Sequence, residues 1–93
     1  MDNIIKLLKE INNRIDTKGY IIISEESKNT KIQYSFYPVD VSIDNELYIE
    51  DKDGYYFKIT NLDNFELIED ECGDCVEFVL RSKKDERYYG ICF

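Results

Sequence analysis

The spacing of apolar residues changes its period once along this chain, and that change limits the folds open to it. Over residues 3–16 apolar side chains recur at intervals of three and four, at Ile4, Leu8, Ile11 and Ile15. This is the period of an amphipathic helix. Further along, apolar and polar residues alternate, which is the period of half-buried strands. The pattern therefore predicts one helix over residues 3–16, then strands, with no other helix longer than two turns.

Short polar turns divide the rest of the chain into strands. We expect strands at residues 20–24, 31–37, 39–43, 46–50, 55–60, 65–69, 75–82 and 87–93. Asp51-Lys52-Asp53-Gly54 predicts a tight hairpin, because Gly54 can adopt a positive φ. Successive short strands joined by short turns favour an antiparallel meander. The predicted fold class is α+β, with one N-terminal amphipathic helix packed on one face of a meander sheet of about five to seven strands.

The alternation also predicts which side chains share a face of this sheet. We expect the helix to cover the face that carries Phe57, Leu67 and Phe78. The opposite face is expected to carry Glu46, Tyr48, Glu50, Tyr56, Glu66, Ile68, Asp70, Glu77 and Val79. The 93 residues fit a single domain over residues 1–93.

The negative charge of the chain is concentrated in its middle. Residues 40–77 carry 13 acids and two bases, a local charge of −11 within an overall charge of −8. Such a block repels nucleic acid and anionic membranes and attracts basic surfaces. We therefore expect a basic protein partner, with no direct nucleic-acid binding and no membrane. We also expect a cytoplasmic protein, because no apolar run approaches the roughly 18 residues of a membrane span and charges interrupt residues 1–14, unlike a signal peptide.

Two groups of residues in this block are candidate partner-binding sites. The first combines aromatic and acidic residues around the predicted hairpin: Tyr48, Glu50, Asp51, Asp53 and Tyr56. The second is the densest acidic stretch: Glu69, Asp70, Glu71 and Asp74. Aromatic residues supply buried anchors in protein interfaces, and carboxylates supply steering and register. The alternative is that these acids only keep a small sheet soluble and blunt its edges.

The chemistry-bearing motifs of the chain favour neither a metal site nor catalysis. Cys72-Gly-Asp-Cys75 is a CxxC, but only Cys92 remains as a further thiol and there is no histidine, whereas a zinc ribbon needs a second ligand pair. A calcium loop with Gly54 at its sixth position would begin at the apolar Ile49. Nothing in the sequence selects a catalytic carboxylate pair, and no serine has a histidine to activate it. We expect no enzyme, no cofactor and no tightly bound metal.

In its layout the chain resembles the small acidic proteins that phages encode against host defence, above all type II-A anti-CRISPR proteins. The resemblance is carried by the opening amphipathic stretch at residues 3–12, the strand at 19–24, and the Tyr- and acid-rich segments at 46–50 and 67–71. It implies an acidic surface that imitates DNA phosphates and occupies the basic groove where a nuclease reads its protospacer-adjacent duplex. Such grooves hold phosphates and base edges with Arg and Lys.

Together these observations predict an inhibitor that acts by stoichiometric binding to a basic, nucleic-acid-handling protein. Two alternatives stay open: an immunity protein that neutralises a nuclease toxin, and a phage structural or assembly subunit that self-associates through Tyr48, Ile68 and Val79. The 13 Ile, seven Asn and absence of Ala are typical of an AT-rich coding sequence and indicate a low-GC bacterium or its phage. The sequence leaves the target, the oligomeric state and any role of the three cysteines undetermined.

Overall fold

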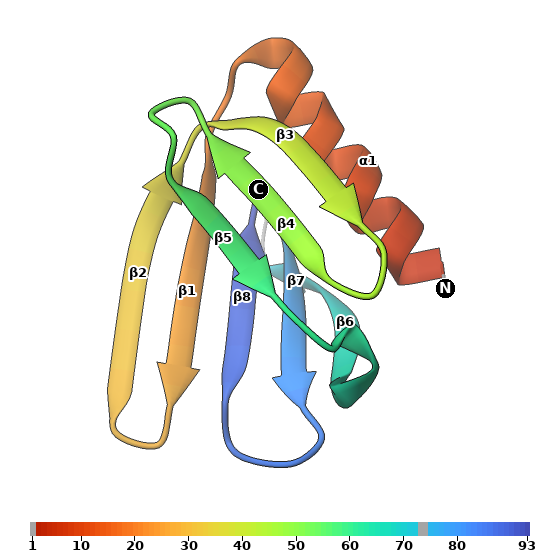
Figure 1. The fold of residues 1–93 in the computed structure, drawn as a ribbon, viewed down its shortest axis with the longest axis vertical. Helices are drawn as coiled ribbons and strands as arrows, with labels where there is room; N and C mark the ends of the chain where they lie inside the picture. The colour runs from red at the N-terminus through yellow and green to blue at the C-terminus, as the bar shows by residue number, and fades with distance from the viewer. Residues whose placement is uncertain (1, 73–74) are drawn as a thin grey trace.

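The computed structural model describes residues 2–72 and 75–93, and their fold is the α+β fold that the sequence predicts (Figure 1). The elements are α1 (Asp2–Thr17), β1 (Ile21–Ser27), β2 (Thr30–Phe36), β3 (Pro38–Ile43), β4 (Leu47–Asp51), β5 (Tyr56–Ile59), the 3₁₀ turn η1 (Leu62–Asn64), β6 (Phe65–Cys72), β7 (Cys75–Ser82) and β8 (Tyr88–Cys92). Within the described residues, α1 is the only helix longer than two turns, as expected.

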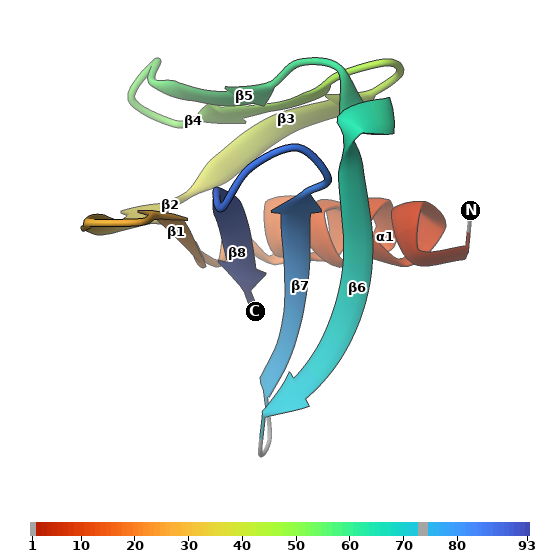
Figure 2. The same cartoon turned by 90° about the horizontal axis from the view of Figure 1, so that it is seen from below.

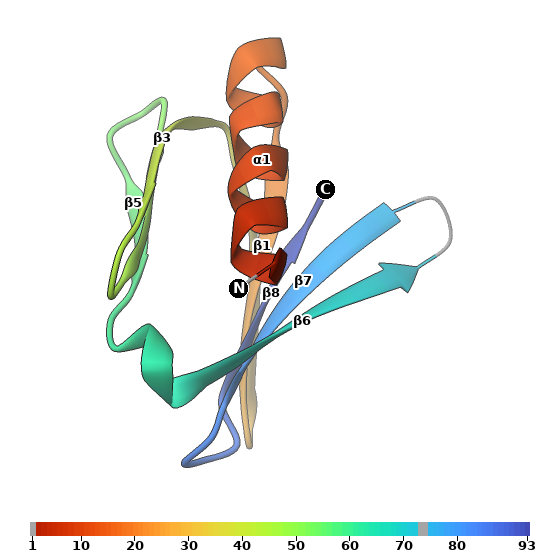
Figure 3. The same cartoon turned by 90° about the vertical axis from the view of Figure 1, so that its right-hand side faces the viewer.

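The strands form two antiparallel sheets. A five-stranded sheet has the order β2-β1-β8-β7-β6, and a three-stranded sheet has the order β3-β4-β5. The small sheet and α1, which lies beside β3, form one layer, and this layer covers one face of the large sheet (Figures 2 and 3). The main sheet is therefore the helix-covered antiparallel sheet that the sequence predicts. Strands β3, β4 and β5 are not part of it and form a second sheet that packs over it.

The core lies between these two layers. Buried apolar side chains come from both layers: Leu7 and Ile11 of α1, Leu47, Ile49, Phe57 and Ile59 of the small sheet, and Ile21, Ile23, Phe78, Leu80 and Ile91 of the large sheet. Burying an apolar side chain of this size contributes about 1.5–3 kcal/mol. The alternating pattern found in the sequence thus serves both sheets, each of which turns one face inward.

The division into two sheets separates residues that the sequence places on one face. Phe57 and Phe78 are both buried as expected, but they belong to different layers. Of the expected solvated face, Tyr48, Glu50 and Tyr56 lie on the outer face of the small sheet. Glu66, Ile68, Asp70, Glu77 and Val79 lie on the outer face of the large sheet, on the other side of the molecule. The reason is that alternation fixes which way a side chain points relative to its own sheet and not which sheet it joins.

Candidate protein-binding surface

A row of side chains crosses the outer face of the small sheet. Asp40, Glu50 and Tyr56 are register partners in β3, β4 and β5, and Tyr48 lies beside them on the same face. The register fixes their order, because cross-strand neighbours on one face have Cβ atoms about 4.5–5.5 Å apart. We call Asp40, Tyr48, Glu50 and Tyr56 the tyrosine–acid face.

The two tyrosines of this face hold one another in place. The rings of Tyr48 and Tyr56 stack with centroids 5.6 Å apart and an interplanar angle of 24°. The Tyr48 hydroxyl donates a hydrogen bond to Glu50 Oε1 at 3.3 Å. Loss of water around this hydroxyl and then the nearby Glu50 carboxylate raise the Tyr48 pKa above its ordinary value, so it remains a donor at neutral pH. The face therefore presents aromatic surface whose geometry is set before any partner arrives.

The two carboxylates of this face have no counter-ion among the residues that the structure describes. Asp40 and Glu50 are opposite one another in adjacent strands, an arrangement in which like charges are destabilising. Of the ion pairs among residues 2–72 and 75–93, none involves either residue, and Lys58 on the same face pairs with Glu46 at 3.7 Å. Asp40 Oδ1 accepts the Val41 amide at 2.9 Å, which satisfies one oxygen without neutralising its charge. The face thus keeps a net negative charge.

The turn between β4 and β5 has the hairpin geometry predicted for it, but its two acids differ. Asp51 is only 6% exposed, and its carboxylate accepts the amides of Tyr37 at 2.7 Å and Asp53 at 2.8 Å. Asp53 is exposed at the tip, followed by Gly54 with φ +91°. Asp51 was expected on the binding surface and instead lies buried as an internal acceptor, because a turn carboxylate can satisfy local backbone donors. Asp53 is left as the acid that a partner can reach.

Exposed tyrosines that sequence reasoning did not select extend this surface beyond the turn. Tyr37 and Tyr55 line, with Tyr56 and Asp53, an open hollow of about 570 Å³. The Lys52 ammonium lies 4.4 Å from the Tyr37 ring centroid, a cation–π distance that draws this lysine onto the ring. Asp40 was also missed. The alternation over residues 39–43 carries the signal for it, because it points Asp40 away from Val39, Val41 and Ile43.

The second predicted group, the acidic stretch at the end of β6, does not form one face. Glu69 points inward and pairs with Lys6 of α1 at 3.0 Å, whereas Asp70 is exposed on the outer face. Glu71 lies in β6 opposite Val76, and its side chain is outside the described residues, as is the whole of Asp74. The described part of this group is therefore split by the strand's own alternation.

The outer face of the large sheet holds a different acidic pair. Asp70 of β6 and Glu77 of β7 are register partners, so two carboxylates again lie opposite one another. Two rows further along the same face, beyond Ile68 and Val79, Glu66 pairs with Arg81 at 3.6 Å. The Asp70–Glu77 pair and the Asp40–Glu50 pair lie on opposite outer faces of the two-layer molecule (Figure 3). One flat groove therefore cannot cover both.

The cysteines lie at one end of the large sheet. Cys72 and Cys75 are register partners that flank the β6–β7 turn, and the two residues between them are outside the described range. Cys75 is exposed and Cys92 is half-buried. Within residues 2–72 and 75–93, no three Cys, Asp or Glu side chains gather in a way that could hold a metal ion. The expectation that the thiols bind no metal remains a prediction.

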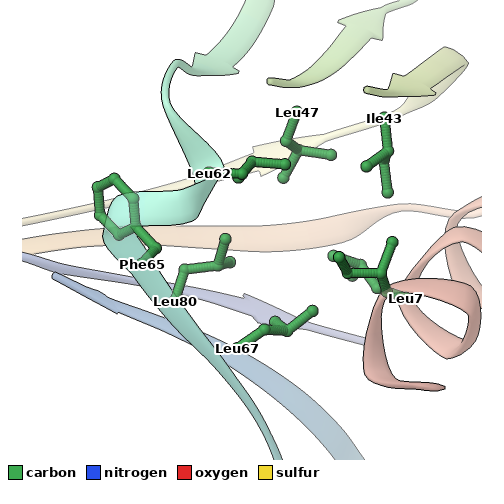
Figure 4. Close-up of a pocket in the computed structure, with 8 residues that line it drawn as sticks. Leu7, Ile43, Leu47, Leu62, Phe65, Leu67 and Leu80 are labelled. Atoms are coloured by element: carbon green, nitrogen blue, oxygen red, sulfur yellow. The ribbon is translucent and has the colours of Figure 1, made fainter. Parts of the chain in front are cut away.

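A cavity of about 50 Å³ lies inside the core rather than at the surface just described (Figure 4). Only apolar side chains line it: Ile4, Leu7, Ile43, Leu47, Leu62, Phe65, Leu67 and Leu80. Figure 4 shows these side chains coming from α1, both sheets and η1. With no polar group to orient a ligand, it is a packing void where the helix, the two sheets and η1 meet.

Comparison of the chain with protein-family models, with curated proteins and with solved structures gives no match. In the described part of the chain, no helix combines the length and apolar character needed to cross a membrane.

Proposed function

We propose that this protein is an acidic inhibitor that binds a basic, nucleic-acid-handling protein through its tyrosine–acid face. The main observation behind this proposal is the Asp40–Glu50 pair. These two carboxylates lie opposite one another, beside a stacked pair of tyrosines, and no ion pair within the described part of the chain involves them. This arrangement lowers the stability of the free protein. It becomes favourable when arginines or lysines of a partner lie across it.

The chemistry of the proposed contact divides between charge and aromatic surface. The carboxylates of Asp40 and Glu50 accept charge-assisted hydrogen bonds from Arg or Lys, and Arg can bind a carboxylate with two parallel bonds. Tyr48 and Tyr56 supply rigid aromatic area, the kind that dominates binding energy in protein interfaces. Asp53, exposed at the tip of the β4–β5 turn, extends the contact around that turn. In this proposal the protein inhibits its target by binding alone and needs neither catalysis nor a cofactor.

The finer proposal follows from the resemblance to type II-A anti-CRISPR proteins. In it, the face imitates DNA phosphates and occupies the groove that reads the protospacer-adjacent duplex, inside a bacterial cytoplasm that a phage or mobile element has entered. An immunity protein against a nuclease toxin is the second candidate, because the same face fits any basic nucleic-acid groove. The structural-subunit alternative receives less support, because Tyr48 lies on one outer face and Ile68 and Val79 on the other.

The test distinguishes the effect of where the acidic residues lie from the effect of the protein's net charge. Asp40→Asn with Glu50→Gln removes two charges from the proposed face, and Asp70→Asn with Glu77→Gln removes the same number from the opposite face. One assay measures DNA cleavage by a type II-A nuclease. A parallel assay captures basic proteins from a bacterial lysate at 0.1 M and at 1 M salt. The Debye length falls from about 10 Å at the lower salt concentration to about 3 Å at the higher one.

We expect wild type to inhibit or bind in a one-to-one, salt-sensitive manner, and the first double variant to lose at least about tenfold in affinity, equivalent to about 1.4 kcal/mol. The second double variant should match wild type. Equal loss in both would show that only net charge matters. No loss in either would leave the acids as a solubility device. Binding of wild type to DNA itself would contradict the proposal directly.

A further inference from the structure

The free edges of the large sheet are protected very unequally. At one edge, β6 carries the exposed acids Glu66 and Asp70, and a second strand placed against it would meet this charge. At the other edge, β2 is Thr30-Lys-Ile-Gln-Tyr-Ser-Phe36, with one lysine and no acid. Figures 1 and 2 show β2 at the margin of the molecule, with β1 on its inner side and no element on its outer side. Long, unprotected edge strands recruit other strands.

The outward-facing backbone groups of β2 can be assigned from its hairpin with β1. Ser27 and Thr30 close a two-residue turn, which places a hydrogen-bonded pair there, and such pairs alternate along an antiparallel ladder. Thr30, Ile32, Tyr34 and Phe36 therefore bond to β1. Lys31, Gln33 and Ser35 direct their N–H and C=O groups away from the sheet.

We propose that a second copy of this chain pairs with β2 in an antiparallel manner about a two-fold axis through Gln33, joining the two large sheets into one. The register centred on Gln33 is the only one that pairs all seven residues of both strands. It sets Gln33 opposite Gln33, and Lys31 opposite Ser35. All three outward-facing residues then exchange backbone hydrogen bonds. The inference is independent of the proposed function, since it uses none of the tyrosine–acid face.

The side chains of β2 favour this occupant over an unrelated strand. Ile32, 50% exposed in the single chain, would lie opposite Tyr34 of the other copy, an aromatic–β-branched pair of the kind that stabilises sheets. Lysine on an edge strand usually opposes pairing. In the proposed register Lys31 lies opposite Ser35 of the other copy. The lysine therefore disfavours only those registers that would place the two Lys31 side chains opposite one another. The acidic block is absent from β2, so the overall charge of −8 does not concentrate at this contact.

The test combines sedimentation with amide hydrogen exchange. Wild type should show a concentration-dependent dimer at up to about 1 mM, and the amides of Lys31, Gln33 and Ser35 should become slower to exchange as the dimer forms. Gln33→Pro removes the central outward N–H, which a free edge tolerates, and should abolish the dimer. Gln33→Thr keeps the amide and should retain it. The amides of Ile32 and Tyr34, bonded to β1, report folding in every variant.

Several outcomes would overturn the inference. A wild type that stays monomeric to about 1 mM has no such contact. A dimer that survives Gln33→Pro, or whose formation leaves the amides of Lys31, Gln33 and Ser35 fast, uses another surface. If Gln33→Pro loses protection at Ile32 and Tyr34, so that the variant is misfolded, the exchange of the three outward amides in wild type decides alone: slowing supports the β2 contact, and no slowing rejects it.

Discussion

The buried carboxylate of Asp51 gives the sharpest prediction about stability. Its two oxygens accept amide hydrogen bonds from Tyr37 and Asp53, and Lys52 donates its own amide to the Tyr37 carbonyl at 3.0 Å. The β4–β5 turn is thereby tied to the junction between β2 and β3. Asp51→Ala removes both acceptors and leaves the partly buried Tyr37 amide without its partner. Hydrogen bonds to a charged group contribute about 1.5–3 kcal/mol each.

We expect Asp51→Ala to lower the free energy of unfolding by about 3 kcal/mol, the lower end for two such bonds, because water can reach the Asp53 amide in its exposed turn. For a domain of this size, that corresponds to a fall in Tm of about 12–24 °C. Asp51→Asn keeps one acceptor oxygen and should lose about half as much. Thermal and urea unfolding followed by circular dichroism measure both.

The control is Asp53→Ala, which changes the exposed acid of the same turn and should stay within about 0.5 kcal/mol of wild type. It removes one charge, as Asp51→Ala does, so a difference between them reports the buried contacts and not the charge. If the two variants are equally stable, or if Asp51→Ala unfolds with wild-type energetics, the carboxylate does not hold the turn and this reasoning is wrong.

Three further predictions concern the stability of the fold: one for the core, one for the end of α1 and one for Tyr34. Leu7→Ala should cost about 3–5 kcal/mol in urea unfolding, because it enlarges an existing void, whereas the half-exposed Ile5→Ala should change little. Lys18→Gly should raise stability by about 0.5–1 kcal/mol, because Lys18 directly follows α1 and has φ +57°. An unchanged urea midpoint would contradict this. Burial raises the pKa of Tyr34 to about 12. In the unfolded state this tyrosine loses its proton near pH 10. Between about pH 10 and 12 the unfolded state therefore binds fewer protons than the folded state, and stability falls as pH rises. Tyr34→Phe should remove this part of the fall, which a comparison of the urea midpoints of the two proteins over this pH range would measure.

The local elements of the fold were predictable because their signals are local. The period of three and four located α1 to within a residue at each end, and Asp51–Gly54 located a hairpin. The sheet order was not predictable in the same way. β8 pairs with β1 across most of the chain, and no turn signal records that pairing. The burial of Asp51 was also not predictable from local signals, because one of its two hydrogen-bond donors, Tyr37, is 14 residues away.

The candidate site shows where sequence order misleads. Glu69 and Asp70 were grouped because they are neighbours in the chain, yet strand alternation sends Glu69 toward Lys6 and Asp70 to the outer face. The informative unit on a sheet is the cross-strand row, which needs the register. Asp40 and Glu50 are ten residues apart in the sequence and adjacent in the fold, and that adjacency appears only once the strands are paired.

The distribution of charge also separates what each surface can do. Acids lie in cross-strand pairs on both outer faces and along β6, where they oppose contact with another copy of an equally acidic chain. The β2 edge is free of acids. A basic partner at the tyrosine–acid face and a second copy at β2 would therefore use different residues, because the first requires the carboxylates that repel the second. If both proposals hold, a basic protein can bind the tyrosine–acid face while two chains pair at β2, and the resulting dimer would present two identical acidic faces.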